Sequence, residues 1–303
     1  NAHQALKKGS EYVSEGRVIV VDMDLKTFFD VVNHDRLMYL LSTTISDKTL
    51  LWLIRKYLQS GILIDGVVSQ RTEGMPQGSP LSPLLSNIVL DELDKELERR
   101  GHKFVRYADD CNIYVRSQRA GERLLASISV FIETKLKLLV NKEKSRVCPV
   151  NHTKFLGYTI QRDGSLSIAN ESVKRFKEKV RKLTKRNRGV NFEQIIVELE
   201  PVMRGWLNYF RHARCKRLLE NIDSWIRRKL RCYRLKQCKR VITLQQFLKS
   251  HGVETWQSWI LALSGKGLWC KSGCPQAHQA LSNRWFNDVG LYNLSLNYAR
   301  LNH

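Results

Sequence analysis

Four aspartates stand where folding alone would not place them. Asp22 and Asp24 end the apolar, β-branched run at residues 17–25, and Asp109 and Asp110 interrupt two apolar segments. Carboxylates at the ends of neighbouring strands converge, and their mutual repulsion is relieved by cations. Mg²⁺ prefers such oxygen ligands, and two ions can clamp the oxygens of a phosphoryl transfer. The spacing predicts this chemistry; the alternative is that an Asp-Asp pair is only a turn.

The seven cysteines suggest a weaker chemical alternative. Cys270 and Cys274 lie near His251 and His278, a set that leaves zinc binding open. No second tight Cys/His pair follows at the spacing of a zinc finger. Reduced thiols in a reducing compartment are therefore the favoured interpretation, since a disulfide framework is unusual in a chain of 303 residues.

The elements that would position the aspartates alternate along the first 168 residues. We expect helices at 2–15, 35–41, 47–58, 84–100 and 120–138, strands at 17–25, 104–107, 111–116, 155–160 and 166–168, and a hairpin at 61–71 with its turn at Asp65-Gly66. After residue 169 the pattern becomes helical. This order predicts an α+β fold with domain boundaries near 165–170 and 235–245.

Positive charge is concentrated in one segment. The chain carries 51 Lys and Arg against 29 Asp and Glu, a net charge of +22, and residues 171–240 alone hold +15. A folded basic segment of this kind indicates a polyanionic partner, most often nucleic acid. A solvated helix face is the alternative, but such a face normally mixes signs. No apolar run is long enough to span a membrane, no secretory signal starts the chain, and no amphipathic anchor favours a membrane surface.

Five segments in order resemble one known family. Residues 24–30 (DLKTFFD), 74–83 (GMPQGSPLSP) and 107–110 (YADD) resemble the motifs of a reverse transcriptase palm. Residues 155–158 (FLGY) resemble its primer grip, and 204–210 (RGWLNYF) its thumb, or maturase domain. The set is similar to bacterial group II intron reverse transcriptase–maturases, in their endonuclease-lacking, class C-like form.

The resemblance implies an architecture. It predicts a right-hand polymerase palm, an antiparallel sheet with helices, followed by an α-helical thumb and a small DNA-binding segment. The corresponding domains are 1–168, 169–240 and 241–303. Because the family has an N-terminal fingers region, we also expect that most of the fingers is missing here and that the fragment alone polymerises poorly.

The resemblance also implies site residues. Asp24, Asp109 and Asp110 would be the catalytic, metal-binding acids, with the Leu25 carbonyl as a further ligand of two Mg²⁺ ions, or Mn²⁺. Nucleotide-binding residues would be Phe29 as a steric gate against a 2′-hydroxyl, the loop residues Gln77 and Gly78, and Lys144 near the pyrophosphate. A solvated lysine is the alternative for Lys144. Primer and template would contact Tyr107, Phe155, Leu156, Gly157 and Tyr158.

The basic segment would bind RNA, through Lys174, Arg175, Lys182, Lys185, Arg186 and Arg188. The predicted function is RNA-directed DNA synthesis for a group II intron, together with binding of intron RNA for splicing and retrohoming. Partners would be an RNA template, a DNA primer, intron RNA, target DNA and deoxynucleoside triphosphates, in the bacterial cytoplasm. The alternatives are a non-catalytic maturase, or a retron, diversity-generating or CRISPR-associated reverse transcriptase.

Overall fold

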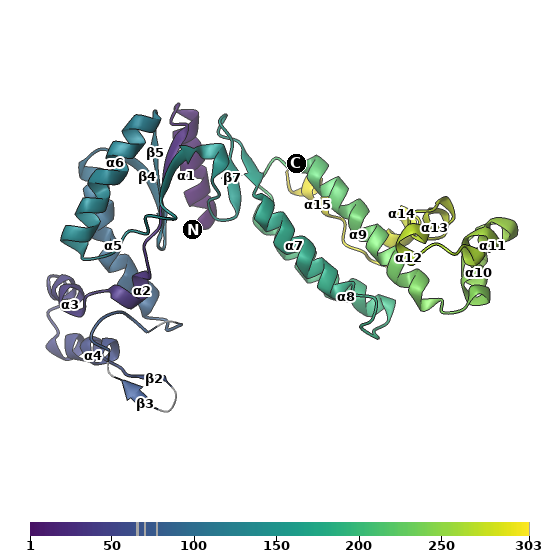
Figure 1. Cartoon of the computed structure of the whole chain (residues 1–303), viewed down its shortest axis with the longest axis horizontal. Helices are drawn as coiled ribbons and strands as arrows, with labels where there is room; N and C mark the ends of the chain where they lie inside the picture. Colours follow the sequence, from purple (N-terminus) through teal and green to yellow (C-terminus); the bar gives the residue numbers. More distant parts are fainter. Residues whose placement is uncertain (65–66, 70, 77, 303) are drawn as a thin grey trace. The chain divides into compact units, whose positions relative to one another are not determined.

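The computed structural model describes residues 1–64, 67–69, 71–76 and 78–302. The chain divides into two compact units, Asn1–Leu166 and Ser167–His303 (Figure 1). The first unit combines strands with helices, and the second is helical from α7 onward. The predicted α+β class is therefore confirmed.

A four-stranded antiparallel sheet lies at the centre of the first unit. Its strands are arranged in the order β4 (Lys103–Tyr107), β5 (Asp110–Val115), β1 (Ile19–Met23) and β6 (Arg146–Pro149). The first three overlap the predicted strands at 104–107, 111–116 and 17–25, with β4 and β5 each beginning one residue earlier than expected. The edge strand β6 was not predicted, because its sequence RVCP is short and lacks apolar alternation.

One face of the sheet builds the main hydrophobic core. Val21 and Met23 of β1 and Ile113 of β5 are buried there among side chains of α5 and α6. Helix α6 approaches closely at Gly121, where a Cβ would lie 2.4 Å from Val147 Cγ1. The strand period of two then sends the alternate residues of β1, including Asp22, to the opposite face.

Helix α1 covers part of that opposite face. At Gly9 it packs so closely on β5 that a Cβ would lie 2.6 Å from the Tyr114 hydroxyl. Tyr114 pairs with Val20, near the start of β1, whereas Asp22 and Asp24 lie toward the other end of that strand. The contact of α1 at Gly9 therefore does not cover the end of the face where the aspartates lie.

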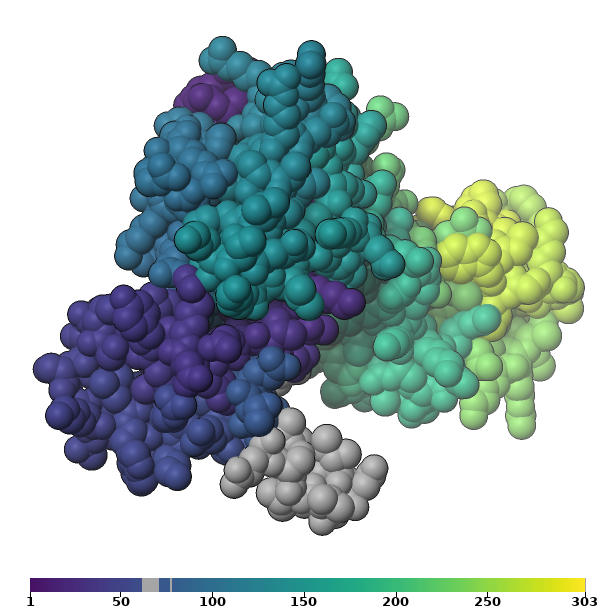
Figure 2. Space-filling model, turned by 60° about the vertical axis from the view of Figure 1, so that its left-hand side comes forward, coloured from purple at the N-terminus to yellow at the C-terminus, as the bar shows by residue number. Residues whose placement is uncertain are grey.

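The remaining elements of the first unit surround this sheet. The helices are α1 (Ala2–Ser14), α2 (Phe28–Val31), α3 (His34–Ser42), α4 (Lys48–Leu58), α5 (Ser82–Arg99), α6 (Gln118–Phe131), the π-helix η1 (Ile132–Leu136) and the 3-10 helix η2 (Val150–His152). Strands β2 (Ile62–Ile64) and β3 (Val67–Ser69) form the predicted hairpin, whose expected turn at residues 65–66 lies outside the described residues. In Figure 2 the segment with α3 and α4 forms a lobe beside the teal region of α6.

A small hairpin leads out of the first unit. Its strands are β7 (Tyr158–Ile160) and β8 (Leu166–Ile168). The strand expected at 155–160 begins only at Tyr158, because Phe155 and Tyr158 close a tight turn before it.

The second unit is built from three long helices, of which the first and third are strongly basic, followed by short ones. Its helices are α7 (Asn170–Leu183), α8 (Phe192–Phe210), α9 (Lys216–Gln237), α10 (Val241–Ser250), α11 (Thr255–Leu263), α12 (Leu268–Lys271), α13 (Pro275–Ala280), α14 (Asn283–Asp288) and α15 (Leu294–Leu301). Among the described residues, no helix is both long and apolar enough to cross a membrane. All seven cysteines are free thiols.

Candidate functional site

The sheet register brings together aspartates that are far apart in the sequence. Strand β1 runs antiparallel to β5, with Asp22 opposite Asn112 and Met23 opposite Cys111. Asp24 and Asp110 are the next residues beyond this last pair, and the charge of Asp24 acts on Asp110. Residues directly opposite in a sheet have Cβ atoms only about 5 Å apart, so the two acidic segments meet at one edge of the sheet.

The electrostatics of this edge reflect the crowding. Desolvation raises the pKa of Asp110 above its ordinary value, and the negative charges of Asp109, Asp22 and Asp24 raise it further. Lys154 opposes this effect only in part. The raised pKa of Asp110 therefore indicates that the protein's own cations do not fully neutralise the negative charge at this edge.

A loop before β6 holds Asp24 in place. Asn141 Nδ2 donates to Asp24 Oδ2 at 3.0 Å, and the Asp24 amide donates to Ser145 Oγ at 3.1 Å. Lys144, between them in the loop, is exposed and places its Nζ 3.9 Å from Asp24 Oδ2. Sequence reasoning singled out Lys144 and missed Asn141 and Ser145, whose signal was their position in the same loop.

The second acidic segment sits on a two-residue turn. Tyr107 pairs with Asp110, so Ala108 and Asp109 alone connect β4 to β5. Ala108 has a φ of 57°, a left-handed conformation that is uncommon for a residue with a Cβ. Asp109 and Tyr107 are exposed at this tip.

Arg106 braces this turn from below. Its Nη1 donates to the Ala108 carbonyl at 2.8 Å and to Asn87 Oδ1 at 3.0 Å. Its Nε and Nη2 donate to the Asp94 carboxylate of α5, at 2.8 Å to Oδ1 and 2.5 Å to Oδ2. The strained turn is thus tied to a core helix. Sequence reasoning missed this brace, although a charged residue in a strand next to the aspartate pair was a signal.

The loop expected at 74–83 is fixed against the segment after β1. The Gly74 amide donates to the Val32 carbonyl at 2.8 Å, and the Met75 amide donates to the Phe29 carbonyl at 2.6 Å. Gly74 has a φ of +80°, and a Cβ there would lie 2.7 Å from the Asp30 carbonyl oxygen. Two segments about 45 positions apart are therefore joined by two backbone hydrogen bonds.

The structure describes Phe29 and Gly78 among the expected nucleotide-binding residues, but not Gln77. Phe28 is buried, as expected for core, and Phe29 is half-buried with its ring 5.3 Å from that of Phe28. Gly78 has a φ of +80° and open space where a Cβ would stand. Gln77 lies outside the described residues.

The expected primer-grip residues form a tight turn. The Phe155 amide donates to the Tyr158 carbonyl at 2.8 Å, and the Tyr158 amide returns a bond of 2.9 Å. Leu156 and Gly157 between them have φ values of 52° and 80°, as a type I′ turn requires. Phe155 and Tyr158 are buried, so their side chains anchor the turn.

The expected RNA-binding residues fall into two groups. Lys174, Arg175 and Lys182 are exposed on α7, and Lys185 and Arg186 are exposed just beyond its end. Arg188 differs, because its guanidinium donates to Glu198 at 2.6 Å and to the Leu183 carbonyl at 2.6 Å. An arginine held in this way supports the end of α7, so we remove it from the expected RNA-binding set.

The donor chemistry of the acidic edge suits a hard divalent cation. Among the described residues, no group of three or more His, Cys, Asp or Glu side chains is arranged to hold a metal ion, at Cys270 and Cys274 or elsewhere. Mg²⁺ is usually bound by one or two carboxylates together with substrate phosphates. Asp24 and Asp110 offer that pair, and the raised pKa of Asp110 marks the charge that a cation would neutralise.

Two families of known sequences match this chain. The one described as "Reverse transcriptase (RNA-dependent DNA polymerase)" matches residues 4–160, just over half of the chain, including the acidic edge. The one described as "Group II intron, maturase-specific domain" matches residues 173–252. The chain belongs to the group II intron reverse transcriptase/maturase family. The sheet with its acidic edge is therefore the palm of a reverse transcriptase, and the helical region after it is the maturase, or thumb, region.

Individual relatives of this reverse transcriptase match about half of the chain. Protein YkfC of Escherichia coli is 30% identical over 181 residues, 48% of this chain and 48% of that protein. The group II intron-encoded protein LtrA of Lactococcus lactis is 27% identical over 242 residues, 58% of this chain and 40% of that protein. The chain thus spans about half of these relatives or less. A telomerase structure from Candida albicans covers 88% of the chain and 53% of its own, with 15% identity and a TM-score of 0.47.

Proposed function

We propose that this reverse transcriptase copies RNA into DNA for a group II intron and also binds the intron RNA. The observation that carries the polymerase role is the register of β1 on β5, whose last pair, Met23 and Cys111, adjoins Asp24 and Asp110, with Asp109 at the neighbouring turn. A protein that only bound RNA would gain nothing from a cluster of carboxylates that repel one another and the RNA phosphates.

The catalytic role falls on the acidic edge. Asp24, Asp109, Asp110 and the Leu25 carbonyl would hold divalent cations, Mg²⁺ or Mn²⁺. When bound, these ions would stabilise the negative charge on the attacking primer oxygen and on the leaving pyrophosphate. Asn141 and Ser145 orient Asp24 for this task.

The neighbouring residues would position the substrates. Phe29 would lie under the sugar of the incoming deoxynucleotide, and the backbone at Gly78, with Gln77, would approach the template–nucleotide pair. Lys144, already beside Asp24, would contact the pyrophosphate. Tyr107 and the turn at residues 155–158 would hold the primer end. Positioning and charge neutralisation then supply most of the rate enhancement.

The intron-binding role falls on the exposed basic residues of α7 and the loop after it. Lys174, Arg175, Lys182, Lys185 and Arg186 are exposed, and within the described residues none of them forms an ion pair. Their partners would be intron RNA and the template–primer duplex, with target DNA as a later substrate of retrohoming.

Substitution of one aspartate separates the two roles. We expect Asp109→Asn to lower primer extension on poly(rA)/oligo(dT) by about 10²–10³-fold or more, while intron splicing proceeds. Asp163→Asn, at another exposed turn, is the matched control and should leave both activities unchanged. Full primer extension by Asp109→Asn would refute the polymerase proposal. Loss of splicing equal to the loss of extension would refute the separation of roles.

A further inference from the structure

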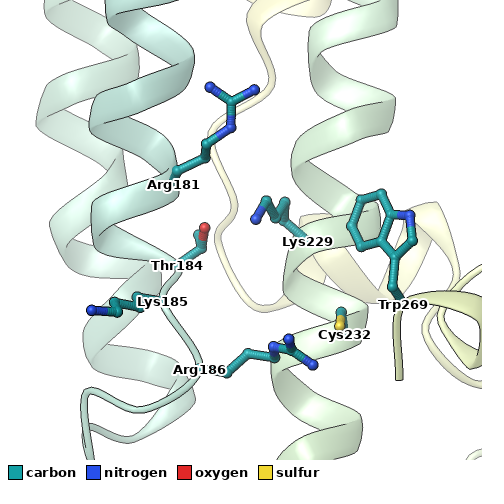
Figure 3. A pocket seen from close by; sticks show the side chains of 7 residues that line it. All are labelled: Arg181, Thr184, Lys185, Arg186, Lys229, Cys232 and Trp269. Atoms are coloured by element: carbon teal, nitrogen blue, oxygen red, sulfur yellow. The ribbon is translucent and has the colours of Figure 1, made fainter. Parts of the chain in front are cut away.

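A cavity of about 340 Å³ lies within the second unit, between the end of α7 and the middle of α9, with α12 at its side. It is lined by Arg181, Thr184, Lys185, Arg186, Lys229, Cys232 and Trp269 (Figure 3). The volume is at the lower end of the ~300–1,000 Å³ that small-ligand sites occupy. It therefore suits one nucleotide-sized group and excludes a duplex.

The cavity gathers positive charge without a counter-charge. In Figure 3 Arg181 and Arg186 extend from the α7 side toward α9, and Lys229 extends from α9 toward α7. Within the described part of the chain, no carboxylate forms an ion pair with any of these three or with Lys185. Burial and the charge of Arg181 lower the pKa of Lys229. Like charges gathered in this way favour binding of an anion.

The other lining polar groups do not supply negative charge. The Thr184 hydroxyl is already donated to the Val180 carbonyl at 2.7 Å. Burial raises the pKa of the Cys232 thiol, which keeps it neutral. The described lining residues therefore include no carboxylate to neutralise these cations, and Arg186 has the neutral Cys232 thiol as a hydrogen-bond partner.

An indole ring is fixed at the wall of this cavity. Trp269 is 41% exposed, and the Arg228 guanidinium lies 4.3 Å from its ring centroid. Arg228 Nη2 also donates to the Trp269 carbonyl at 3.2 Å. A ring that is held by its neighbours and still partly exposed offers a stacking surface at low cost in conformational entropy.

We infer that this cavity binds one unpaired nucleotide of a nucleic-acid strand. Arg181, Arg186 and Lys229 take its phosphate, and Trp269 stacks on its base. The inference rests on the proposed nucleic-acid binding and adds a preference to it. Exposed lysines on α7 give affinity for any phosphate backbone, whereas a cavity of this size selects strands with a base that is free to leave the helix.

The test compares an RNA hairpin that carries a single-nucleotide bulge with the same hairpin fully paired, by fluorescence anisotropy. The protein should bind the bulged RNA about 10-fold more tightly. Arg181→Ala with Lys229→Ala should abolish this preference. The control is Lys182→Ala with Lys236→Ala, which removes the same charge from the same two helices outside the cavity. It should weaken binding of both RNAs equally.

Trp269→Ala tests the stacking step separately. It should weaken binding of the bulged RNA by about 5- to 10-fold, because one base–aromatic stack contributes about 1 kcal/mol or more and the preference that can be lost is about 10-fold. Binding of the paired RNA should stay unchanged, and Trp269→Phe should restore part of the loss. The same comparison with bulged and paired DNA hairpins shows which nucleic acid is the ligand. If the bulge is preferred equally in DNA and RNA, either strand type is bound; if it is preferred only in RNA, the ligand is RNA. Because Arg181→Gln keeps much of the side chain, it supplies a second cavity variant if the double variant does not fold.

Two different results would separately contradict the nucleotide-binding cavity and the proposed nucleic-acid binding. If the cavity variants and the surface variants weakened both RNAs to the same extent, the cavity would be only part of a diffuse basic surface, and the inference would be wrong. If the unmodified protein bound neither RNA at low salt, the proposed nucleic-acid binding itself would fail.

Discussion

Arg106 and Asp94 form a two-pronged ion pair beneath the turn that carries Asp109. The guanidinium binds both carboxylate oxygens of Asp94 and, with its remaining prong, the Ala108 carbonyl. Bidentate pairs of this kind fix orientation as well as adding energy. We therefore regard Asp94 as a positioning residue for the acidic edge, although it touches no substrate.

The first prediction concerns this pair. Asp94→Asn should lower kcat for primer extension by about 10- to 100-fold, because a catalytic group displaced by about 1 Å can lose that much rate. The KM for the deoxynucleotide should change little. Asp91→Asn, which loses only a surface ion pair with Lys95 one turn earlier, is the control. An unchanged kcat in Asp94→Asn with normal folding would show that the turn holds its shape without the brace.

The second prediction separates steric contact from backbone strain at two glycines. Gly74 and Gly78 both have a φ of +80°, but only Gly74 has backbone atoms within 3 Å of the place where a Cβ would stand. Gly78→Ala should lower the free energy of unfolding by about 1 kcal/mol from strain alone. Gly74→Ala should cost clearly more, about 2–4 kcal/mol, because the Asp30 carbonyl must also move. Urea unfolding of both variants measures the difference, and equal losses would mean that the loop moves freely.

The third prediction concerns Phe29, the proposed gate. Phe29→Ala should raise incorporation of ribonucleotides relative to deoxynucleotides, since the removed ring is the group proposed to oppose a 2′-hydroxyl. Phe28→Ala, in the buried ring beside it, should instead lower the free energy of unfolding by about 3–5 kcal/mol with little change in the sugar ratio. The ratio of the two kcat/KM values is the measurement, and no change in it for Phe29→Ala would remove the gate assignment.

The fourth prediction concerns pH and Asp223 on α9. The buried Asp223 carboxylate accepts hydrogen bonds from the Leu294 amide at 3.0 Å and the Ser295 amide at 2.9 Å. Burial raises the pKa of this carboxyl group. Because the folded-state pKa is the higher one, the contribution of Asp223 to stability is complete below the pKa of about 4 of an unfolded aspartate and falls as pH rises through the folded value. Asp223→Asn does not titrate.

The stability of the unmodified protein relative to Asp223→Asn should therefore fall between about pH 4 and neutrality, measured by urea unfolding at each pH. A relative stability that rose over this interval would mean that the two amide hydrogen bonds outweigh the burial of the charge.

The fifth prediction concerns the basic segment. Each phosphate contact releases counterions, so the affinity for RNA should fall steeply with salt, by about 10³-fold between 50 and 200 mM if six phosphates are contacted. Lys174→Ala with Arg175→Ala should make the slope of log affinity against log salt shallower by about 2. Arg188→Ala should leave the slope unchanged, because that guanidinium is held by Glu198. Affinity that did not depend on salt would contradict the assignment of this segment.

The sequence alone determined the elements and the kinds of chemistry they carry. Short apolar segments predicted β1, β4 and β5, helical spacing predicted α5 and α7, and the Asp and Lys/Arg patterns predicted an acidic site and a polyanion-binding segment. These features are local, because burial periodicity and charge are written into neighbouring residues. The order of the motifs was sufficient to indicate the family, which the matches over residues 4–160 and 173–252 confirmed.

Only the tertiary structure decided which remote residues meet. The pairing of β1 with β5 brings Asp24 and Asp110 to the same end of the sheet, the close approach of two backbones explains why position 74 is a glycine, and the packing of α5 under β4 gives Arg106 its partner Asp94. The cavity between α7 and α9 likewise takes residues from three separate stretches, 181–186, 229–232 and 269. Such contacts depend on register and on the fit between packed surfaces, and neither leaves a periodic trace in a single sequence.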